Sequence, residues 1–238
     1  MVGIGPGGPL DRTRRAELTI SRSEVVIGYR RYLELIGDLT SGKELIATCM
    51  TQEVERCRTA IERASRGQEV CLVSSGDPGV YGMAGLVLEL SVASKSNLGI
   101  EIIPGVSSSN AAAARLGAPL MCDFATISLS DLLVPWETIR ARLQAVASAD
   151  LVTVLYNPRS KNRRKQLDEA AAIFRRYRPG KIPVGVGTAV GTDEEIIMLS
   201  DLDNFLTLSI GMRSIVIIGN TSSRHLGSWF VTPRGYTL

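Results

Sequence analysis

The sequence predicts an α/β protein whose sheets are largely parallel and lie between layers of helices. Short apolar runs that read as strands alternate with helical patterns along the whole chain, which is the pattern of α/β folds. Hydrophobic residues make up 45% of the 238 residues and aromatic residues only 5%, so Val, Ile, Leu and Ala carry the packing. That composition is typical of strands buried on both faces, as in parallel sheets covered by helices.

The first half of the chain is expected to supply five strands and five helical segments. Most of the strands are short apolar runs bounded by small residues. The helix over 51–64 is amphipathic, with Val54, Cys57 and Ile61 on one face. The expected strands are 1–4, 24–29, 44–48, 70–73 and 99–103, and the helical segments begin near Leu10 and at 30–36, 51–64, 83–90 and 110–116.

The second half repeats the alternation of strands and helices. A helix ends and a new block begins around 117–120, so the sequence predicts two domains, residues 1–116 and 117–238. The tail to Leu238 contains Pro, Gly and scattered aromatics. The expected strands are 125–129, 150–156, 182–189, 195–199 and 214–219, and the expected helices are 136–147 and 163–177.

Composition excludes several classes of function. The net charge of +3 permits an acidic small ligand but does not require a nucleic acid, and we expect neither nucleic acid nor membrane as a partner. The four cysteines form no Cys-x-x-Cys pair and His225 is the only histidine, so we expect no metal site and no histidine-based triad. No apolar run reaches about 18 residues, and the first four residues read as a strand rather than a signal peptide. We therefore expect a cytoplasmic protein with reduced thiols.

The stretch from Val70 to Gly82 reads as a strand, a tight loop and the start of a helix. Ligands of α/β sheets bind beyond the carboxyl ends of strands, where the glycines of this loop would let a flat ligand approach the backbone. An ordinary turn is the alternative, in which Asp77 before Pro78 makes an Asx-turn.

The first loop also suggests a ligand site. Gly3, Gly5 and Gly8 match the spacing G-x-G-x-x-G, but Pro6 removes an N–H group from the loop that would hold a phosphate. We therefore expect a ligand other than a pyrophosphate, or a plain strand–helix connection. Ser107 or Ser108 is placed to cap the helix that follows 99–103, which would also present N–H donors to a ligand.

Small or polar residues follow strands in both halves, at 5–7, 75–77, 107–108, 156–157 and 187–188. If the halves face each other, these loops would line one cleft between domains. Two basic clusters accompany them. The run 159–165 reads more readily as a solvated helix start than as a binding patch, and Arg12, Arg14 and Arg15 would together neutralise a polycarboxylate.

Three motifs taken together carry a resemblance to a known family. They are VGIGPGG at 2–8, SGDPGVYG at 75–82 and IPGVSSS at 103–109. With them the chain resembles the tetrapyrrole methylases, which transfer methyl groups from S-adenosylmethionine. Further markers at 28–33, 120–133 and 155–161 resemble the branch of cobalamin biosynthesis that methylates a precursor at C17 and contracts its ring.

The resemblance implies two αβα domains with mixed, mostly parallel sheets, a homodimer, and a methyl donor held in the cleft between the domains. The substrate would be a polycarboxylate tetrapyrrole and the second product S-adenosylhomocysteine. Pro6 fits this donor, which has no phosphate. The implied contacts to S-adenosylmethionine are Pro6, Ser75, Gly76, Asp77, Val80, Ser107, Ser108, Asn157, Gly187 and Thr188.

The implied chemistry needs few acid–base groups. The tetrapyrrole carbon is already nucleophilic and the sulfonium methyl already electrophilic, so holding both in line and excluding water supplies much of the catalysis. Ring contraction would use a proton donor or acceptor, for which Asp77, Tyr81 and Asp123 are candidates, each with an alternative structural role.

Two other interpretations stay open. One is a different methylase of this family, acting on another tetrapyrrole carbon, on ribosomal RNA or on a modified histidine; RNA methylation predicts a broad basic surface, which a net charge of +3 does not favour. The other is a non-catalytic nucleotide-binding α/β module. Whether the macrocycle carries cobalt is not decided by the sequence.

Overall fold

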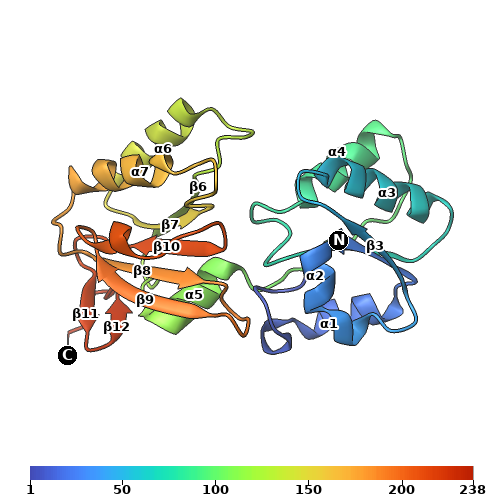
Figure 1. Cartoon of the computed structure of the whole chain (residues 1–238), viewed down its shortest axis with the longest axis horizontal. Helices are drawn as coiled ribbons and strands as arrows, with labels where there is room; N and C mark the ends of the chain where they lie inside the picture. The colour runs from blue at the N-terminus through green and yellow to red at the C-terminus, as the bar shows by residue number, and fades with distance from the viewer. Residues whose placement is uncertain (238) are drawn as a thin grey trace. The chain divides into compact units, whose positions relative to one another are not determined.

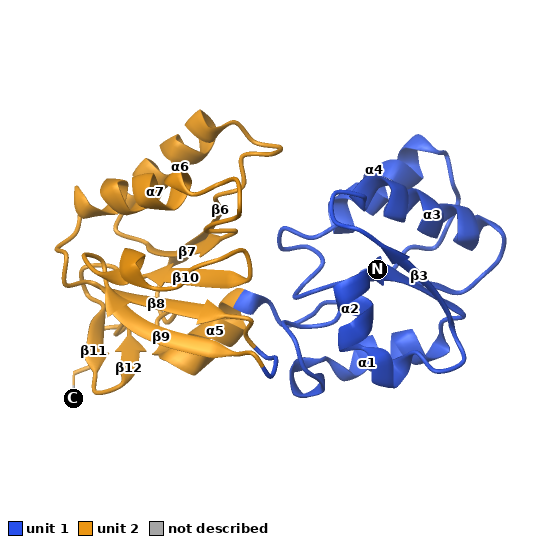
Figure 2. Ribbon diagram, viewed as in Figure 1, with its two compact units in different colours: residues 1–108, 191–193 blue, residues 109–190, 194–238 orange. Residues whose placement is uncertain are grey.

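The computed structural model describes residues 1–237 and divides them into two compact units. Unit 1 comprises residues 1–108 and 191–193, and unit 2 comprises residues 109–190 with the chain from 194 onward (Figure 2). The predicted domain boundary at 116 and 117 stays a prediction, and Leu238, the last residue of the predicted second domain, lies outside the described residues.

Unit 1 is built on a fully parallel sheet with the strand order β1-β4-β2-β3. The strands are β1 (Val2–Gly3), β2 (Val25–Tyr29), β3 (Glu44–Thr48) and β4 (Val70–Ser74). Successive residues of β2 and β4 point to opposite faces and are apolar on both, because helices cover both faces. The sequence prediction of a parallel, double-covered sheet is confirmed for this unit.

Two pairs of helices cover the two faces of that sheet (Figure 1). On one face, α1 (Arg14–Arg22) and α2 (Arg30–Leu35) pack against Val26, Cys71 and Val73. On the other, α3 (Glu53–Ser65) and α4 (Ala84–Ala93) pack against Val25, Ile27 and Leu72. Short 3-10 turns at Pro9–Asp11 and Gly37–Leu39 precede α1 and follow α2.

Two expectations for unit 1 are wrong. Residues 99–103 form no strand; Ile103 alone makes a parallel bridge to Val2, because β1 is only two residues long and offers little to pair with. Val54 does not belong to the buried face of α3, since its exposed fraction is 43%, and the buried face of that helix includes Arg56, Cys57 and Ala60.

Unit 2 is built on a five-stranded mixed sheet with the order β6-β7-β10-β8-β9. Its strands are β6 (Phe124–Ser128), β7 (Val152–Tyr156), β8 (Pro183–Thr188), β9 (Ile196–Asp201) and β10 (Ser214–Ile218). Only β6 and β7 pair in parallel; the other three neighbouring pairs are antiparallel. This sheet is therefore the mixed one of the two main sheets, and β8 pairs with β9 in antiparallel fashion because no helical crossover joins them.

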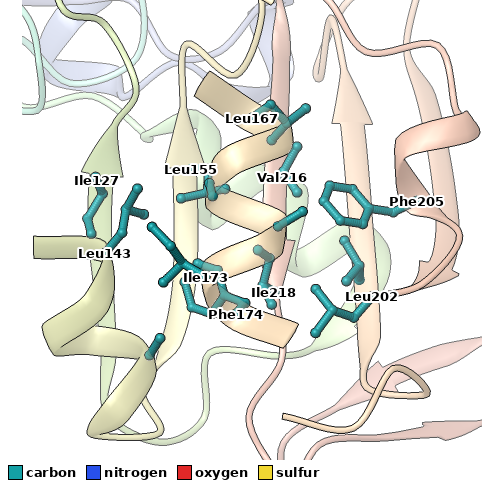
Figure 3. Packing of buried hydrophobic residues seen from close by; sticks show 14 of the residues in the cluster. Ile127, Leu143, Leu155, Leu167, Ile173, Phe174, Leu202, Phe205, Val216 and Ile218 are labelled. Carbon is teal, nitrogen blue, oxygen red and sulfur yellow. The ribbon is translucent and has the colours of Figure 1, made fainter. Parts of the chain in front are cut away.

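Helices lie on both faces of this sheet. A hydrophobic core of the unit lies where α6 (Trp136–Ser148) and α7 (Lys165–Arg175) pack on one face, and Figure 3 shows Leu143 and Phe174 of these helices against Leu155 and Ile218 of the sheet. On the other face lies α5 (Ser108–Leu116) (Figure 1). A Cβ at Gly185 would lie 2.3 Å from Cδ1 of Leu116, so the absence of a side chain in β8 lets α5 pack closely.

A small third sheet in unit 2 was missed by the sequence analysis. It has the order β11-β12-β5 and consists of β5 (Gly117–Ala118), β11 (Arg224–Leu226) and β12 (Trp229–Val231). A signal for it exists, because Gly227 and Ser228 separate two short runs by two residues, which is the spacing of a β-hairpin. Gly227 has φ of +59°, as a tight hairpin turn requires.

Candidate functional site

Three loops of unit 1 meet at the carboxyl edge of its parallel sheet. They follow β1, β4 and the bridge residue Ile103. Gly5 and Gly76 exchange two main-chain hydrogen bonds, of 3.2 and 2.7 Å, and Gly3 N–H donates to the carbonyl of Ile103 at 2.9 Å. The three predicted loops of this half therefore form one continuous backbone surface.

Glycine is required where these loops touch. A Cβ at Gly105 would lie 2.1 Å from the carbonyl oxygen of Gly76, and a Cβ at Gly3 would lie 2.7 Å from the same oxygen. Gly76 itself has φ of +60°. Gly3, Gly76 and Gly105, one from each motif, thus allow the backbones of the three loops to contact one another.

Asp77 fastens two of the loops together. Its Oδ1 accepts a hydrogen bond from Gly79 N–H at 2.8 Å, and its Oδ2 accepts one from Gly105 N–H at 3.1 Å. The first bond makes the Asx-turn that the sequence suggested. The second bond links the loop after β4 to the loop after Ile103.

The surface formed by these loops carries little charge. Residues 5–8, 75–82 and 104–108 contain no Lys or Arg, and their polar side chains are three serines (Ser75, Ser107, Ser108), Asp77 and Tyr81. Pro6 lacks the N–H group that a phosphate-binding loop would offer at its position. Val80 and Tyr81 have exposed fractions of 37% and 51%.

The predicted residues of unit 2 also share one sheet edge. The strands β6, β7 and β8 end at the edge where β9 and β10 begin. Asn157, directly after β7, donates from Nδ2 to Ser128 Oγ at 3.0 Å. Thr188, at the end of β8, shares a hydrogen bond of 2.7 Å with the hydroxyl of Ser214. Gly187 precedes Thr188, and a Cβ there would lie 2.8 Å from Cγ2 of Val190.

Left-handed backbone conformations occur in these same loops. Tyr81, Asn157 and Ala189 have φ of +53°, +51° and +50°. Such conformations cost a non-glycine residue about 1–2 kcal/mol, and they concentrate where the chain must present a particular surface. Each of the three lies within two residues of a predicted cofactor contact, Val80, Asn157 or Thr188.

Asp123 is not brought together with the other candidates of unit 2. It immediately precedes β6, whose register pairs Phe124 with Val152 and Ser128 with Tyr156. Asp123 therefore lies at the opposite edge of the sheet from Asn157 and Thr188.

The basic run 159–165 divides into structural and unpaired cations. Arg163 is 8% exposed and donates to the carbonyl of Asn157 at 2.9 Å and to Ser130 Oγ at 3.5 Å. Arg159 forms an ion pair of 2.6 Å with Asp168. The preferred interpretation of a solvated helix start is wrong for Arg163, which holds the loop in place.

A pocket that the sequence did not predict lies beside this loop. Its volume is about 530 Å³, and the residues that line it are Arg159, Ser160, Lys161, Arg164, Asp168, Ile210, Gly211 and Met212. Residues 210–212 precede β10, far from 159–168 in the sequence, so only the sheet order brings the two segments together.

Arg12, of the first basic cluster, is a structural residue. Its side chain is 1% exposed and donates two hydrogen bonds to Asp38, at 2.9 and 3.0 Å. The hydrogen bond from Arg12 lowers the pKa of Asp38. Arg14 pairs with Glu17 at 3.0 Å. The interpretation of this cluster as a site for a polycarboxylate is therefore not supported for Arg12 and Arg14.

The remaining composition-based expectations concern metals, thiols and membranes. Within residues 1–237 there is no group of three or more His, Cys, Asp or Glu side chains placed to hold a metal, and the four cysteines are free. Burial raises the pKa of the Cys57 and Cys71 thiols to about 11. Among the described helices, none is long and apolar enough to span a bilayer.

Comparison with known sequences agrees with the motifs. The family model "Tetrapyrrole (Corrin/Porphyrin) Methylases" matches residues 1–205. A probable cobalt-factor III C(17)-methyltransferase of Salmonella typhimurium is 44% identical, with 100% of this chain and 99% of the relative covered. The cobalt-factor III methyltransferase of Priestia megaterium is 42% identical; the match covers 99% of this chain but 44% of that longer relative. A precorrin-3B C(17)-methyltransferase of a Sinorhizobium species is 39% identical over 94% of this chain and 89% of its own length.

Comparison with solved structures agrees with the fold. The crystal structure of the methyltransferase CobJ has a TM-score of 0.90 and 34% identity, with 98% of both chains covered. The uroporphyrin-III C-methyltransferase of Thermus thermophilus, solved with S-adenosylhomocysteine, has a TM-score of 0.69 and 22% identity over 92% of this chain and 95% of its own, which shows the shared fold. The α/β fold class and the family resemblance are both confirmed, and the chain belongs to the tetrapyrrole methylases.

Proposed function

We propose that this protein is an S-adenosylmethionine-dependent C-methyltransferase of cobalamin biosynthesis that methylates cobalt-factor III or precorrin-3B at C17, with contraction of the macrocycle. The observation that carries the proposal is the 44% identity with a probable cobalt-factor III C(17)-methyltransferase along practically the full length of both chains. The close likeness to the methyltransferase CobJ supports the same conclusion.

We assign the methyl donor to the loops at the two sheet edges. In unit 1 the proposed contacts are Pro6, Ser75, Gly76, Asp77, Val80, Ser107 and Ser108, and in unit 2 they are Asn157, Gly187 and Thr188. The support from unit 1 is a surface of backbone and serine hydroxyls without a basic side chain, in which glycines of neighbouring loops contact one another. The support from unit 2 is a set of side chains held at one edge by hydrogen bonds.

The chain's part in catalysis is chiefly placement. The donor supplies an electrophilic methyl group, and the tetrapyrrole supplies the carbon nucleophile. The loops of unit 1 hold fixed positions because backbone contacts and the carboxylate of Asp77 fasten them, and those of unit 2 are held by side-chain hydrogen bonds. Fixed orientation of two reactants is worth several kcal/mol of the activation barrier, so a site with few acid–base groups is sufficient for methyl transfer.

Ring contraction asks for a proton donor or acceptor as well. Asp77, Tyr81 and Asp123 remain the proposed candidates. Both carboxylate oxygens of Asp77 already accept main-chain hydrogen bonds, which favours a positioning role for it. Tyr81 has a half-exposed phenol at the end of a strained loop, which favours it over Asp123.

We also propose a cytoplasmic homodimer with no nucleic acid or membrane partner. Light scattering after size-exclusion chromatography tests the dimer, and an apparent mass of one chain would contradict it. The net charge of +3 is the support for leaving nucleic acid out.

The activity is tested by incubating the purified protein with methyl-labelled S-adenosylmethionine and either cobalt-factor III or metal-free precorrin-3B. The expected result is one labelled methyl group on the macrocycle and an equal amount of S-adenosylhomocysteine. Comparison of the two substrates decides whether cobalt is required. Binding of S-adenosylmethionine without transfer to either macrocycle, or transfer to RNA, would contradict the proposal.

A further inference from the structure

We infer that the pocket between the loop after β7 and the loop before β10 binds carboxylate side chains of the tetrapyrrole. The inference rests on the proposed function, because it assigns a place in unit 2 to the acidic substituents of that substrate. Three cations and one carboxylate line this pocket, which has a volume of about 530 Å³.

Two of the three cations form no ion pair within the part of the chain that the structure describes. Arg159 is neutralised by its ion pair with Asp168 at 2.6 Å. Lys161 and Arg164 are exposed and form no ion pair with any residue in 1–237. Lys161 and Arg164, exposed and without an ion pair, provide two positive charges for an anion in this pocket, and the Arg fork suits a carboxylate.

Hydrogen bonds within the loop 160–163 fix the conformation of the segment that carries these cations. Ser160 and Arg163 exchange main-chain hydrogen bonds of 2.9 and 3.3 Å, and Ser160 Oγ accepts a further bond of 3.1 Å from Arg163 N–H. The buried guanidinium of Arg163 then anchors the turn to the carbonyl of Asn157. Lys161 lies inside this turn and Arg164 directly after it, so both cations have a fixed attachment.

The lining of the pocket also includes an uncharged segment. It consists of Ile210, Gly211 and Met212, and Met212 has an exposed fraction of 49%. An exposed methionine beside unpaired cations suits a ligand with an apolar body and anionic substituents. A tetrapyrrole with acidic side chains has that character. A nucleic acid backbone would need an extended basic track rather than one pocket whose lining includes an uncharged segment.

Hydrogen bonds connect the pocket to the proposed cofactor contacts of the same unit. Gly211 N–H donates to Ser214 Oγ at 3.0 Å, and Ser214 Oγ shares a bond of 2.7 Å with Thr188. On the other side, Arg163 bonds to Asn157. Substituents bound in this pocket would therefore lie at the same sheet edge as Asn157 and Thr188, which suits a substrate that must meet the methyl donor.

The test removes the two unpaired charges. The double variant Lys161→Gln/Arg164→Gln is compared with Lys161→Arg/Arg164→Lys, which keeps both charges. The control is Arg142→Gln/Lys181→Gln, which removes the same charges from exposed positions of unit 2 outside the pocket. Each protein is assayed for the KM and kcat of cobalt-factor III and for the dissociation constant of S-adenosylmethionine.

We expect Lys161→Gln/Arg164→Gln to raise the KM for cobalt-factor III at least tenfold, because both charged contacts to the carboxylates of the substrate are lost. The kcat at saturation and the affinity for S-adenosylmethionine should change less than twofold. The charge-preserving variant should recover most of the loss, and the control should behave as wild type. A KM unchanged in the charge-removing variant, or an equal loss in the control, would overturn the inference.

The same assay separates failure of the inference from failure of the proposed function. If wild-type protein does not methylate cobalt-factor III or precorrin-3B, the proposed function is wrong and the inference falls with it. If wild type is active and the charge-removing variant has the same KM and the same dependence on salt concentration, the proposed function stands and only the pocket assignment is wrong.

Discussion

The two sheet edges that carry the proposed cofactor contacts are stabilised by different kinds of contact. In unit 1, glycine backbones touch one another and the loops carry no basic side chain. In unit 2, side chains hold the edge, with Asn157 bonded to Ser128 and Thr188 bonded to Ser214, and a basic pocket adjoins it. The neutral edge suits the nucleoside-like methyl donor, and the charged edge suits a substrate with several carboxylates.

This difference has a consequence for tolerance to substitution. Where backbones are in direct contact, there is no room for an added side-chain atom. Where side chains hold the edge, a single substitution removes only one hydrogen bond. We therefore expect single changes in unit 1 to be more damaging than single changes in unit 2.

The largest effect is expected for Gly105→Ala. The new Cβ would lie 2.1 Å from the carbonyl oxygen of Gly76 and 2.9 Å from the carbonyl carbon of Gly3, so the three loops must separate. Forced overpacking of this kind costs about 3 kcal/mol. We expect a loss of that size in the free energy of unfolding, measured by urea titration, together with loss of S-adenosylmethionine binding in the protein that remains folded.

Gly99→Ala is the matched control for that variant. It lies in the same connection between α4 and α5, and an added Cβ there would meet nothing within 4 Å. We expect its free energy of unfolding to stay within about 0.5 kcal/mol of wild type. If Gly105→Ala were as stable as Gly99→Ala and bound the donor normally, the backbone-contact account of unit 1 would be wrong.

The next smaller effect on the free energy of unfolding concerns a buried arginine, which the two units hold in different ways. In unit 1, Arg12 is held by the carboxylate of Asp38, and in unit 2 the described partners of Arg163 are a carbonyl and a hydroxyl. Asp38→Asn should cost about 2 kcal/mol at pH 7, because it leaves the buried guanidinium of Arg12 without a counter-charge. Glu34→Gln, at an exposed position nearby, is the control and should have no measurable effect.

The cost of Asp38→Asn should depend on pH. The hydrogen bond from Arg12 lowers the pKa of Asp38 in the folded protein below its value of about 3.8. The stabilisation is therefore complete above that value and is lost as the pH falls through the lower folded-state pKa. The difference in unfolding free energy between wild type and Asp38→Asn should shrink toward zero below about pH 4. A difference that stayed constant from pH 7 to pH 3 would contradict the ion-pair explanation.

Sequence patterns predicted the elements that are determined locally. The buried run at Val70–Ser74 was predicted because apolar residues on both faces of a strand need helices on both sides. The Asx-turn at Asp77 followed from the short spacing of Asp, Pro and Gly. The expected strand at 99–103 failed because its pairing depends on β1, whose length the local pattern does not set.

What the sequence did not predict depends on contacts between distant segments. The pocket joins 159–168 to 210–212 only because β7 and β10 are neighbours in the sheet. The burial of Arg163 likewise depends on Ser130, which another loop supplies. The pattern of small or polar residues after strands already grouped 156–157 with 187–188, and the family resemblance then assigned Asn157, Gly187 and Thr188 to the methyl donor.

The smallest expected effect concerns Asn157, and it tests whether side chains hold the edge of unit 2. Asn157→Gly and Asn157→Ala both remove the 3.0 Å bond to Ser128, which is worth about 1 kcal/mol. They differ because Asn157 has φ of +51°, a conformation that glycine adopts freely and alanine only at a cost of about 1 kcal/mol. We expect Asn157→Ala to be less stable than Asn157→Gly by that amount in urea titrations, and both to be less stable than wild type. Equal stability of the two variants would mean that the backbone relaxes at this position, and equal stability of Asn157→Gly and wild type would mean that the edge of unit 2 does not depend on this side chain.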